Sequence, residues 1–268
     1  ALDIALSTGA DVIDINGDTG TNNAAINSVV TSTAAIDFSF ELVEAGKNIT
    51  VTSLLTGAGS ATVIADEDIN ITTITSTGNI LIKADHDIDI NGTITGAGAS
   101  NVSLFAAKAA STDGQIVDGT GKIVMGTGDL LLRAGNGIGA TGTGAIETEG
   151  LTDVAALTAT GGIFLNNSSS GDITIKQVIA DGVTVTGAST ATSGAVSIIN
   201  ATNLDINVSA AVTAASGGVV LTSGDVLNID ATVTATNSTV DLDGKSIDID
   251  GNVVAAGTTA LDASAGTI

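Results

Sequence analysis

The chain has no cysteine, proline, tryptophan or tyrosine, and only four phenylalanines in 268 residues. Without cysteine it can form no disulfide, no cysteine-based zinc site and no thiol nucleophile. Ordinary globular cores rely on aromatic side chains for much of their buried area, so an ordinary globular domain is a poor fit. A disordered chain is a poor fit too, because 43% of the residues are apolar. The architecture must therefore bury many small aliphatic side chains without large ones.

Basic residues are also scarce. Seven Lys and Arg face 29 Asp and Glu, which gives a formal net charge of −22. Such a chain repels phosphate backbones, and its few bases form no stripe along the sequence. The longest uninterrupted apolar run has four residues, for example Val253 to Ala256, which is too short for a membrane-spanning helix. We expect no nucleic-acid partner and no membrane insertion.

One short phrase recurs along the chain. Two apolar residues separated by one residue are flanked by Asp, Asn, Ser or Thr, and a turn of small residues follows. The phrase stands at Asn48–Thr52, Asp68–Thr72, Asp87–Asn91, Asp172–Lys176, Asn203–Asn207 and Ser246–Asp250. Its first apolar residues Ile49, Ile69 and Ile88 are 20 and 19 residues apart. In the second half the same positions are assigned to Leu204, Leu227 and Ile247. The chain is therefore built from repeats of about 20 residues.

The pattern within each repeat indicates strands. Apolar residues alternate with polar ones, β-branched Ile, Val and Thr fill the alternating stretches, and Gly, Asn, Asp and Ser gather between them. Three short strands per turn of about 20 residues predict an all-β fold, a parallel β-helix or β-solenoid. At a spacing of about 4.8 Å per coil, about 13 coils would make a rod about 60 Å long. Small aliphatic residues would fill its narrow interior, where large aromatic side chains should fit badly.

We expect residues 1–268 to form a single continuous solenoid, with irregular coils or loops near residues 16–47 and 108–150. The chain opens at Ala1 without a visible signal peptide, and we expect it to be part of a longer protein. Its last segment, Leu261–Ile268, shows no polar cap, and solenoids need capped ends for solubility. The end is therefore expected either to pair with another copy, end to end, or to continue into more of the same chain.

Several stretches resemble a known family. The most specific is Gly128–Gly139, which reads Gly-Asp-Leu-Leu-Leu-Arg-Ala-Gly-Asn-Gly-Ile-Gly, and Leu157–Asn167 and Gly171–Ile175 follow it. These phrases resemble filamentous-haemagglutinin-like bacterial exoproteins and adhesins. The resemblance implies a right-handed β-helical shaft that is extracellular or on the bacterial cell surface. It carries over no catalytic residue, because shaft repeats in that family have none.

One phrase matches the opening of a calcium-binding loop. Asp87, Asp89 and Asn91 have the spacing of calcium ligands and Gly92 follows them, but the closing position is Gly98 instead of Glu. Asp248 and Asp250 repeat the same spacing in a later coil. The sequence favours carboxylates on an outward strand face, with weak Ca²⁺ binding between stacked acids as the alternative. No other cofactor is expected.

Catalysis is not expected. Sugar-processing sites on β-helices need aromatic platforms or a base near bound calcium, and the only arginine is Arg133. His86, the only histidine, stands between Asp85 and Asp87 and is expected on the surface at a corner of a coil. Threonine pairs such as Thr73-Ile-Thr75 and Thr93-Ile-Thr95 have the spacing of ice-binding ladders, but they do not recur at one fixed offset in each coil.

Two functions remain open from the sequence. In the first, the chain is an extracellular structural protein whose coils stack end to end into a rod or fibre, such as a surface filament, sheath or matrix. In the second, it is a stalk segment of a large bacterial surface adhesin whose binding domains lie elsewhere. A ligand on a host or cell surface would belong to the second.

Overall fold

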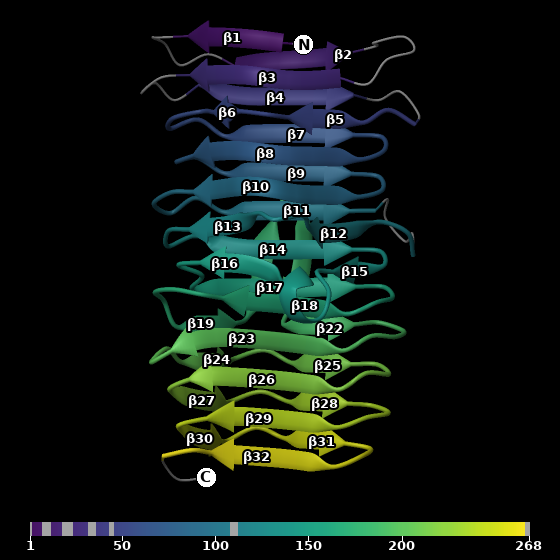
Figure 1. Cartoon of the computed structure of the whole chain (residues 1–268), viewed down its shortest axis with the longest axis vertical. Coiled ribbons are helices and arrows are strands. Elements are labelled where there is room, and N and C mark those ends of the chain that lie inside the picture. The colour runs from purple at the N-terminus through teal and green to yellow at the C-terminus, as the bar shows by residue number, and fades with distance from the viewer. Residues whose placement is uncertain are drawn as a thin grey trace.

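The structure is a computed structural model that describes residues 2–6, 12–17, 24–31, 36–42, 46–107 and 112–265. Its strands stack one above another into an elongated rod, with the two chain termini at opposite ends (Figure 1). Two long sheets of 15 strands each run the length of the rod, and every pairing within them is parallel. The predicted all-β solenoid is therefore confirmed.

The first sheet contains β1 (Leu2–Leu6), β3 (Ala24–Thr31), β5 (Ile49–Val51), β6 (Leu54–Leu55), β8 (Ile69–Ser76), β10 (Ile88–Gly96), β12 (Gln115–Asp118), β13 (Lys122–Met125), β15 (Gly137–Ile138), β16 (Ile146–Glu149), β18 (Ile163–Asn167), β23 (Val196–Thr202), β26 (Val219–Gly224), β29 (Val240–Gly244) and β32 (Thr259–Ala263). The second sheet contains β2 (Val12–Gly17), β4 (Asp37–Leu42), β7 (Ala61–Ala65), β9 (Ile80–Ala84), β11 (Val102–Ala106), β14 (Asp129–Ala134), β17 (Asp153–Thr158), β19 (Ile173–Ile175), β22 (Ala188–Thr190), β24 (Ile206–Val208), β25 (Val212–Ala214), β27 (Val226–Ile229), β28 (Val233–Ala235), β30 (Ser246–Ile249) and β31 (Val253–Ala255). A separate hairpin consists of β20 (Gln177–Ala180) and β21 (Val183–Thr186).

Each coil takes roughly 22 residues, and the rod has about 10 turns. The expected number of about 13 coils is wrong, because long corners and the β20–β21 hairpin lengthen several coils. In the later coils three separate strands make one turn, for example β26, β27 and β28. In β8 and β10 two of the three merge into one strand, with a register irregularity between Ile90 and Thr93.

The stacking register agrees with the repeat in the first half of the chain. Ile49 pairs with Ile69, and Ile69 pairs with Ile88, all in the first sheet. In the second half the predicted alignment is wrong in two ways. Ile206, and not Leu204, pairs with Leu227. Leu227 and Ile247 also lie in the second sheet, whereas Ile49, Ile69 and Ile88 lie in the first. Asn203 adopts a left-handed φ of 65° and Leu204 N–H bonds to the carbonyl of Ala201 at 3.2 Å. This turn holds Leu204 in the corner, so the strand begins two residues later.

The core is one continuous column of aliphatic side chains between the sheets. Stacked Ile, Val, Leu and Ala residues with almost no exposed surface fill it from Ile26 to Ile247. Two aromatic side chains also lie inside, since Phe38 is fully buried and Phe40 is 6% exposed. The expectation that large side chains fit badly is wrong here. The small residue Ala61 stands beside Phe38 in the next coil and leaves room for its ring.

The described parts of the two segments expected to be irregular contain strands as well as turns. The described part of residues 16–47 includes β3 and β4, and that of residues 108–150 includes β12 to β16. The single helical element among the described residues is the 3-10 turn η1 (Gly142–Gly144). No helix in this described part is long and apolar enough to cross a membrane.

The β20–β21 hairpin lies against the outer face of the second sheet. Its Val178 and Val185 pack on Phe105, Leu131 and Ala155 and form a second, smaller apolar cluster outside the solenoid. The strands beneath it therefore bury apolar residues on the outer face as well as on the inner one, and all five residues of β11 are buried. The two hairpin strands are antiparallel, unlike the strands of the two large sheets.

We predict that Ile88→Asp strongly destabilises the rod. Ile88 is fully buried between Ile69 and Ile116 of the neighbouring coils, so the new carboxylate would lie in the apolar column without a partner. The expected loss is about 3–5 kcal/mol in the free energy of unfolding, measured by urea denaturation.

The matched control is Thr95→Asp, which places the same group on the outer face of the same strand, where the side chain is partly solvated. It should change the urea midpoint little. Equal losses for the two variants would contradict the assignment of Ile88 to the core.

Candidate functional site: the acidic corner around His86

Asp and Asn residues occupy the positions just before many strands, and their side chains join one coil to the next. In the first sheet the Oδ1 atom of Asn48 accepts the N–H of Asp68 at 3.2 Å. Asp68 Oδ1 accepts the N–H of Asp87 at 3.1 Å, and Asp87 Oδ1 accepts the N–H of Gln115 at 2.8 Å. We call Asn48, Asp68, Asp87 and Gln115 the corner ladder. Each acceptor in it satisfies a backbone donor that the parallel sheet leaves over at the turn.

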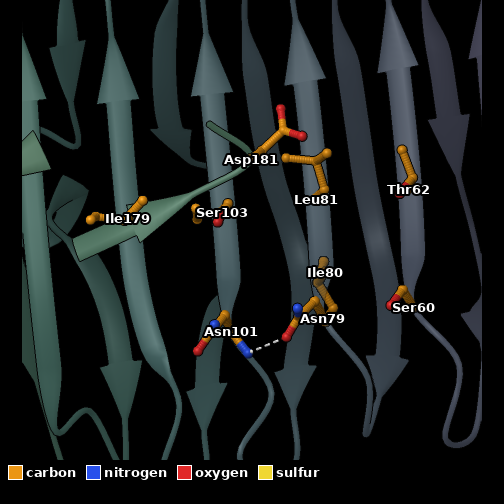
Figure 2. Close-up of a pocket in the computed structure, with 10 residues that line it drawn as sticks. Ser60, Thr62, Asn79, Ile80, Leu81, Asn101, Ser103, Ile179 and Asp181 are labelled. Carbon is orange, nitrogen blue, oxygen red and sulfur yellow. Dashed lines mark hydrogen bonds between the residues drawn. The ribbon is translucent and has the colours of Figure 1, made fainter. Parts of the chain in front are cut away.

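The same arrangement recurs at corners that precede strands of the second sheet. Asn79 Oδ1 accepts the N–H of Asn101 at 3.1 Å, the contact drawn as a dashed line in Figure 2, and Asn101 Oδ1 accepts that of Asp129 at 2.9 Å. Further along the rod, Asp172 accepts from Asp205 N–H at 3.0 Å and Asp205 accepts from Val226 N–H at 2.9 Å. This explains why the repeated phrase so often begins with Asp or Asn.

His86 lies at the corner ladder with three carboxylates around its ring. Its Nδ1 atom is 2.8 Å from Asp68 Oδ1 and 3.6 Å from Asp87 Oδ2, and its Nε2 atom is 3.5 Å from Asp113 Oδ1. Asp68, His86 and Asp113 come from three successive corners of the rod, before β8, β10 and β12. We call Asp68, His86, Asp87 and Asp113 the His86 corner. The ring is 37% exposed, as expected for a surface histidine, but it is not isolated.

These carboxylates favour the protonated ring. The hydrogen bond to Asp68 is the main cause that raises the pKa of His86 above its usual 6.5. Partial burial acts against it, and the negative charges of Asp87, Asp68 and Asp113 add to the rise. A protonated His86 therefore links three coils electrostatically, with solvent weakening each contact.

The same corner contains the group of side chains best placed to hold a metal ion. Ligand atoms of Glu67, Asp68 and His86 lie within 4.8 Å of one another. Asp68 is already engaged, because its Oδ1 accepts from Asp87 N–H and faces His86, and its Oδ2 accepts from Asn48 Nδ2 at 3.2 Å. A cation would have to displace these bonds, so the geometry favours a proton on His86 over a metal ion.

The calcium candidates from the sequence do not form one loop. Asp87 belongs to the corner ladder, whereas Asp89 and Asn91 follow it along strand β10, where every second residue points the same way but about 6.6 Å apart. Asp248 and Asp250 are exposed near the end of β30, in the other sheet. Burial, then the charges of Asp87 and Asp68, raise the pKa of Asp89.

Two other carboxyl groups on the strands are similarly affected. Burial is the main cause that raises the pKa of Asp118, with Glu147 adding to it, and the same cause followed by Asp241 and Asp262 raises that of Asp243. Asp243 and Asp262 stand opposite each other on β29 and β32. Like charges in register repel, which is the electrostatic cost of stacking acidic coils.

Sequence reasoning missed a buried polar spine at another corner. Asn167 and Asn200 are nearly inaccessible, and Asn167 Nδ2 donates to Asn200 Oδ1 at 2.8 Å. Asn167 Oδ1 also accepts from Thr148 Oγ1 at 3.2 Å, and Asn200 Nδ2 donates to the carbonyl of Asp205 at 2.7 Å. The signal in the sequence is an Asn after a short apolar stretch, at Asn167 at the end of β18 and at Asn200 within β23. The spine satisfies backbone groups where the chain turns inside the rod.

A polar cavity of about 390 Å³ lies between the hairpin and the second sheet (Figure 2). Asn79, Asn101 and Ser60 line one side of it, and Ile179 and Asp181 of the hairpin overhang the other. The amide Oδ1 atoms of Asn79 and Asn101 are committed to the ladder bonds. The cavity brings together hydroxyl and amide groups, which suit solvent, and it contains no pair of carboxylates for acid–base catalysis.

The threonine ladder is short. Thr73 and Thr75 stand in register with Thr93 and Thr95, but the next coil places Lys122 and Val124 at those positions. Two aligned coils make only a small threonine patch.

We predict that Asp87→Ala destabilises the rod and that Asp87→Asn does not. Alanine removes the acceptor of Gln115 N–H, which should lower the free energy of unfolding by about 1–2 kcal/mol, whereas the amide oxygen of asparagine can keep that bond. Urea denaturation measures both variants. If Asp87 instead served mainly to bind Ca²⁺, added calcium in the millimolar range would raise the melting temperature of the wild type and Asp87→Asn would abolish that rise.

We also predict that the rod loses stability as pH rises across the titration of His86. Because the folded-state pKa is raised above 6.5, the stabilisation is complete below pH 6.5 and disappears as pH passes the folded-state value. His86 is the only histidine, so its ring resonances in NMR report the pKa directly. The melting temperature of His86→Gln should be flatter than that of the wild type between pH 6 and pH 8. Parallel curves for the two proteins would refute the coupling.

Comparison of the chain with family models, with curated proteins and with solved structures finds no match. The solenoid is therefore established by its own geometry, and the resemblance to filamentous-haemagglutinin-like proteins stands on the sequence phrases alone.

Proposed function

We propose that the protein is an extracellular structural rod that extends into a fibre by end-to-end stacking of coils. The observation that carries this proposal is the continuity of the parallel ladder. The first sheet runs from β1 to β32, and one apolar column lies between it and the second sheet. In such a ladder each coil makes the same kind of contact with the next coil. A second copy can therefore extend the rod without a new type of interface.

The coil formed by β30, β31 and β32 supports self-association. β32 pairs only with β29, and β31 only with β28, so the far edges of these strands have no strand partner among the described residues. Val254 is 50% exposed and Leu261 is 37% exposed. An edge that offers unpaired backbone groups beside apolar side chains is a template for another strand. The proposal takes a second copy of the chain as the partner.

A structural role also agrees with the surface chemistry. The carboxyl groups with raised pKa values, Asp89, Asp118 and Asp243, lie on β10, β12 and β29, and none of them lines the cavity beside the hairpin. We therefore propose that the protein is not an enzyme. Export from a bacterium agrees with the absence of cysteine and with the family resemblance of the repeats.

The alternative is a stalk of a large bacterial adhesin. The phrases at Gly128–Gly139 and Leu157–Asn167 favour it, because they resemble shaft repeats of filamentous-haemagglutinin-like proteins. In that case the rod holds binding domains away from the cell surface, and the open edge is covered by the next coil of a longer chain.

Negative-stain electron microscopy across a concentration series tests the two functions. We predict uniform fibres that grow in number with concentration for the wild type, and isolated short rods for Leu261→Lys. Leu261 stacks on the buried Leu242, so a lysine there places a charge on the apolar end of the column that the next copy must cover.

The matched control is Ala260→Lys. Ala260 precedes Leu261 and stands beside Asp241 in the outer row, so its lysine adds the same charge without blocking the apolar end. It should leave the fibres intact. Isolated rods for the wild type at every concentration would reject self-assembly and favour the stalk.

A further inference from the structure

Arg133 is exceptional among the basic residues of this acidic rod. Four lysines form ion pairs: Lys83 with Asp181, Lys122 with Glu149, Lys176 with Asp129 and Asp153, and Lys245 with Asp225. Arg133 has neither an ion pair nor a hydrogen-bond partner for its side chain within the part of the chain that the structure describes. It is half-buried, and a guanidinium group has five N–H donors to satisfy.

The surroundings of Arg133 explain why it has no carboxylate partner among the described residues. Arg133 stands on β14 between Phe105 of β11 and Leu157 of β17, so both neighbours in its row are apolar. Lys83 of β9 follows in the same row, beyond Phe105, and its Nζ atom lies 5.7 Å from the centre of the Phe105 ring. Two cations thus flank one aromatic ring on the outer face of the second sheet.

These side chains enclose a cavity of about 230 Å³. Lys83 and Arg133 provide charged donors, Phe105 and Val183 provide apolar walls, and Asp85 also lines the cavity. Val183 belongs to the hairpin, whose turn residue Asp181 forms the ion pair with Lys83. Asp85 has an interaction of its own, so it is not a free carboxylate available to Arg133.

We propose that this cavity binds an oxoanion, a carboxylate or a sulfate, carried on a small and partly apolar body. The planar guanidinium of Arg133 is suited to two parallel hydrogen bonds with such a group, and Lys83 adds a second charge. Phe105 and Val183 contact the apolar part of the ligand. Asp181 competes with the ligand for Lys83.

The test uses the single arginine as its reporter. The chain has one Arg, so its Nε–H group gives one side-chain signal of its kind in a ¹⁵N-correlated NMR spectrum. Sodium acetate, benzoate and sulfate are titrated against the purified protein at constant ionic strength, with chloride as the replaced ion. We predict a saturable shift of the Arg133 signal, with benzoate binding more tightly than acetate because the apolar walls bury its ring. A shift that never saturates, or none, would overturn the proposal.

Two variants separate charge from folding. Both Lys83→Gln and Asp181→Asn break the ion pair that ties the hairpin turn to the sheet. Asp181 has a φ of 50°, a left-handed conformation that asparagine tolerates well. Lys83→Gln should weaken benzoate binding by about threefold to tenfold, whereas Asp181→Asn should strengthen it, because it frees Lys83. If both variants weaken binding equally, the effect comes from loosening the hairpin and the proposal fails.

A matched control and a concentration series complete the design. Lys122→Gln removes a lysine that pairs with Glu149 in the other sheet, and it should leave benzoate affinity unchanged. A series of protein concentrations, recorded without added acetate, benzoate or sulfate, distinguishes the two sources of the oxoanion. If the Arg133 signal shifts with protein concentration alone, the ligand is a carboxylate of a second copy. If it shifts only when benzoate, acetate or sulfate is added, the ligand is a free oxoanion. The proposal can fail independently of fibre formation, because the same titrations can be carried out in the Leu261→Lys variant, which is expected not to form fibres.

Discussion

The in-register parallel backbone ladder is the constraint on which the rest of this molecule depends. It places equivalent residues of successive coils about 4.8 Å apart, so every choice of side chain is repeated against itself. Inside, Ile49, Ile69 and Ile88 stack into a dry column. Outside, the same rule sets Asp243 beside Asp262, whose charge adds to the rise in the pKa of Asp243 that burial mainly causes. The ladder thus produces both the main stabilisation and the main electrostatic cost.

Side chains at the corners satisfy backbone hydrogen-bonding groups that the sheets leave without a partner. Where the chain turns between strands, some backbone N–H groups have no acceptor within the sheets. The corners contain no proline, which lacks an N–H, so each of these donors needs another acceptor. Asn48, Asp68 and Asp87 accept these donors from the following coil. Inside the rod Asn167 donates to the side chain of Asn200, which in turn donates to the carbonyl of Asp205. Acidic residues in this protein therefore have a structural role that their number and charge would not suggest.

Much of the fold could be predicted from the sequence, because a period of two within strands and of about 20 between coils is visible in one dimension. The failures have local causes. Leu204 was misaligned because a left-handed residue, Asn203, delays the strand by two positions. The hairpin was missed although Asp181-Gly182 stands between two alternating apolar stretches, a strong hairpin signal. The calcium site suggested by the spacing of Asp87, Asp89 and Asn91 stays a prediction, and in the structure Asp87 accepts the backbone N–H of Gln115.

The sequence by itself determined the class of architecture: small aliphatic residues at alternating positions, no proline, and turns of small residues specify stacked strands and little else. The tertiary structure decided which residues meet. It brought Asp68, His86 and Asp113 together from three coils, and it set Lys83, Phe105 and Arg133 in one row. These contacts join residues 18 to 28 positions apart, and their pairing depends on the exact length of each corner. Corner lengths vary along the chain, so only the folded coil fixes the register.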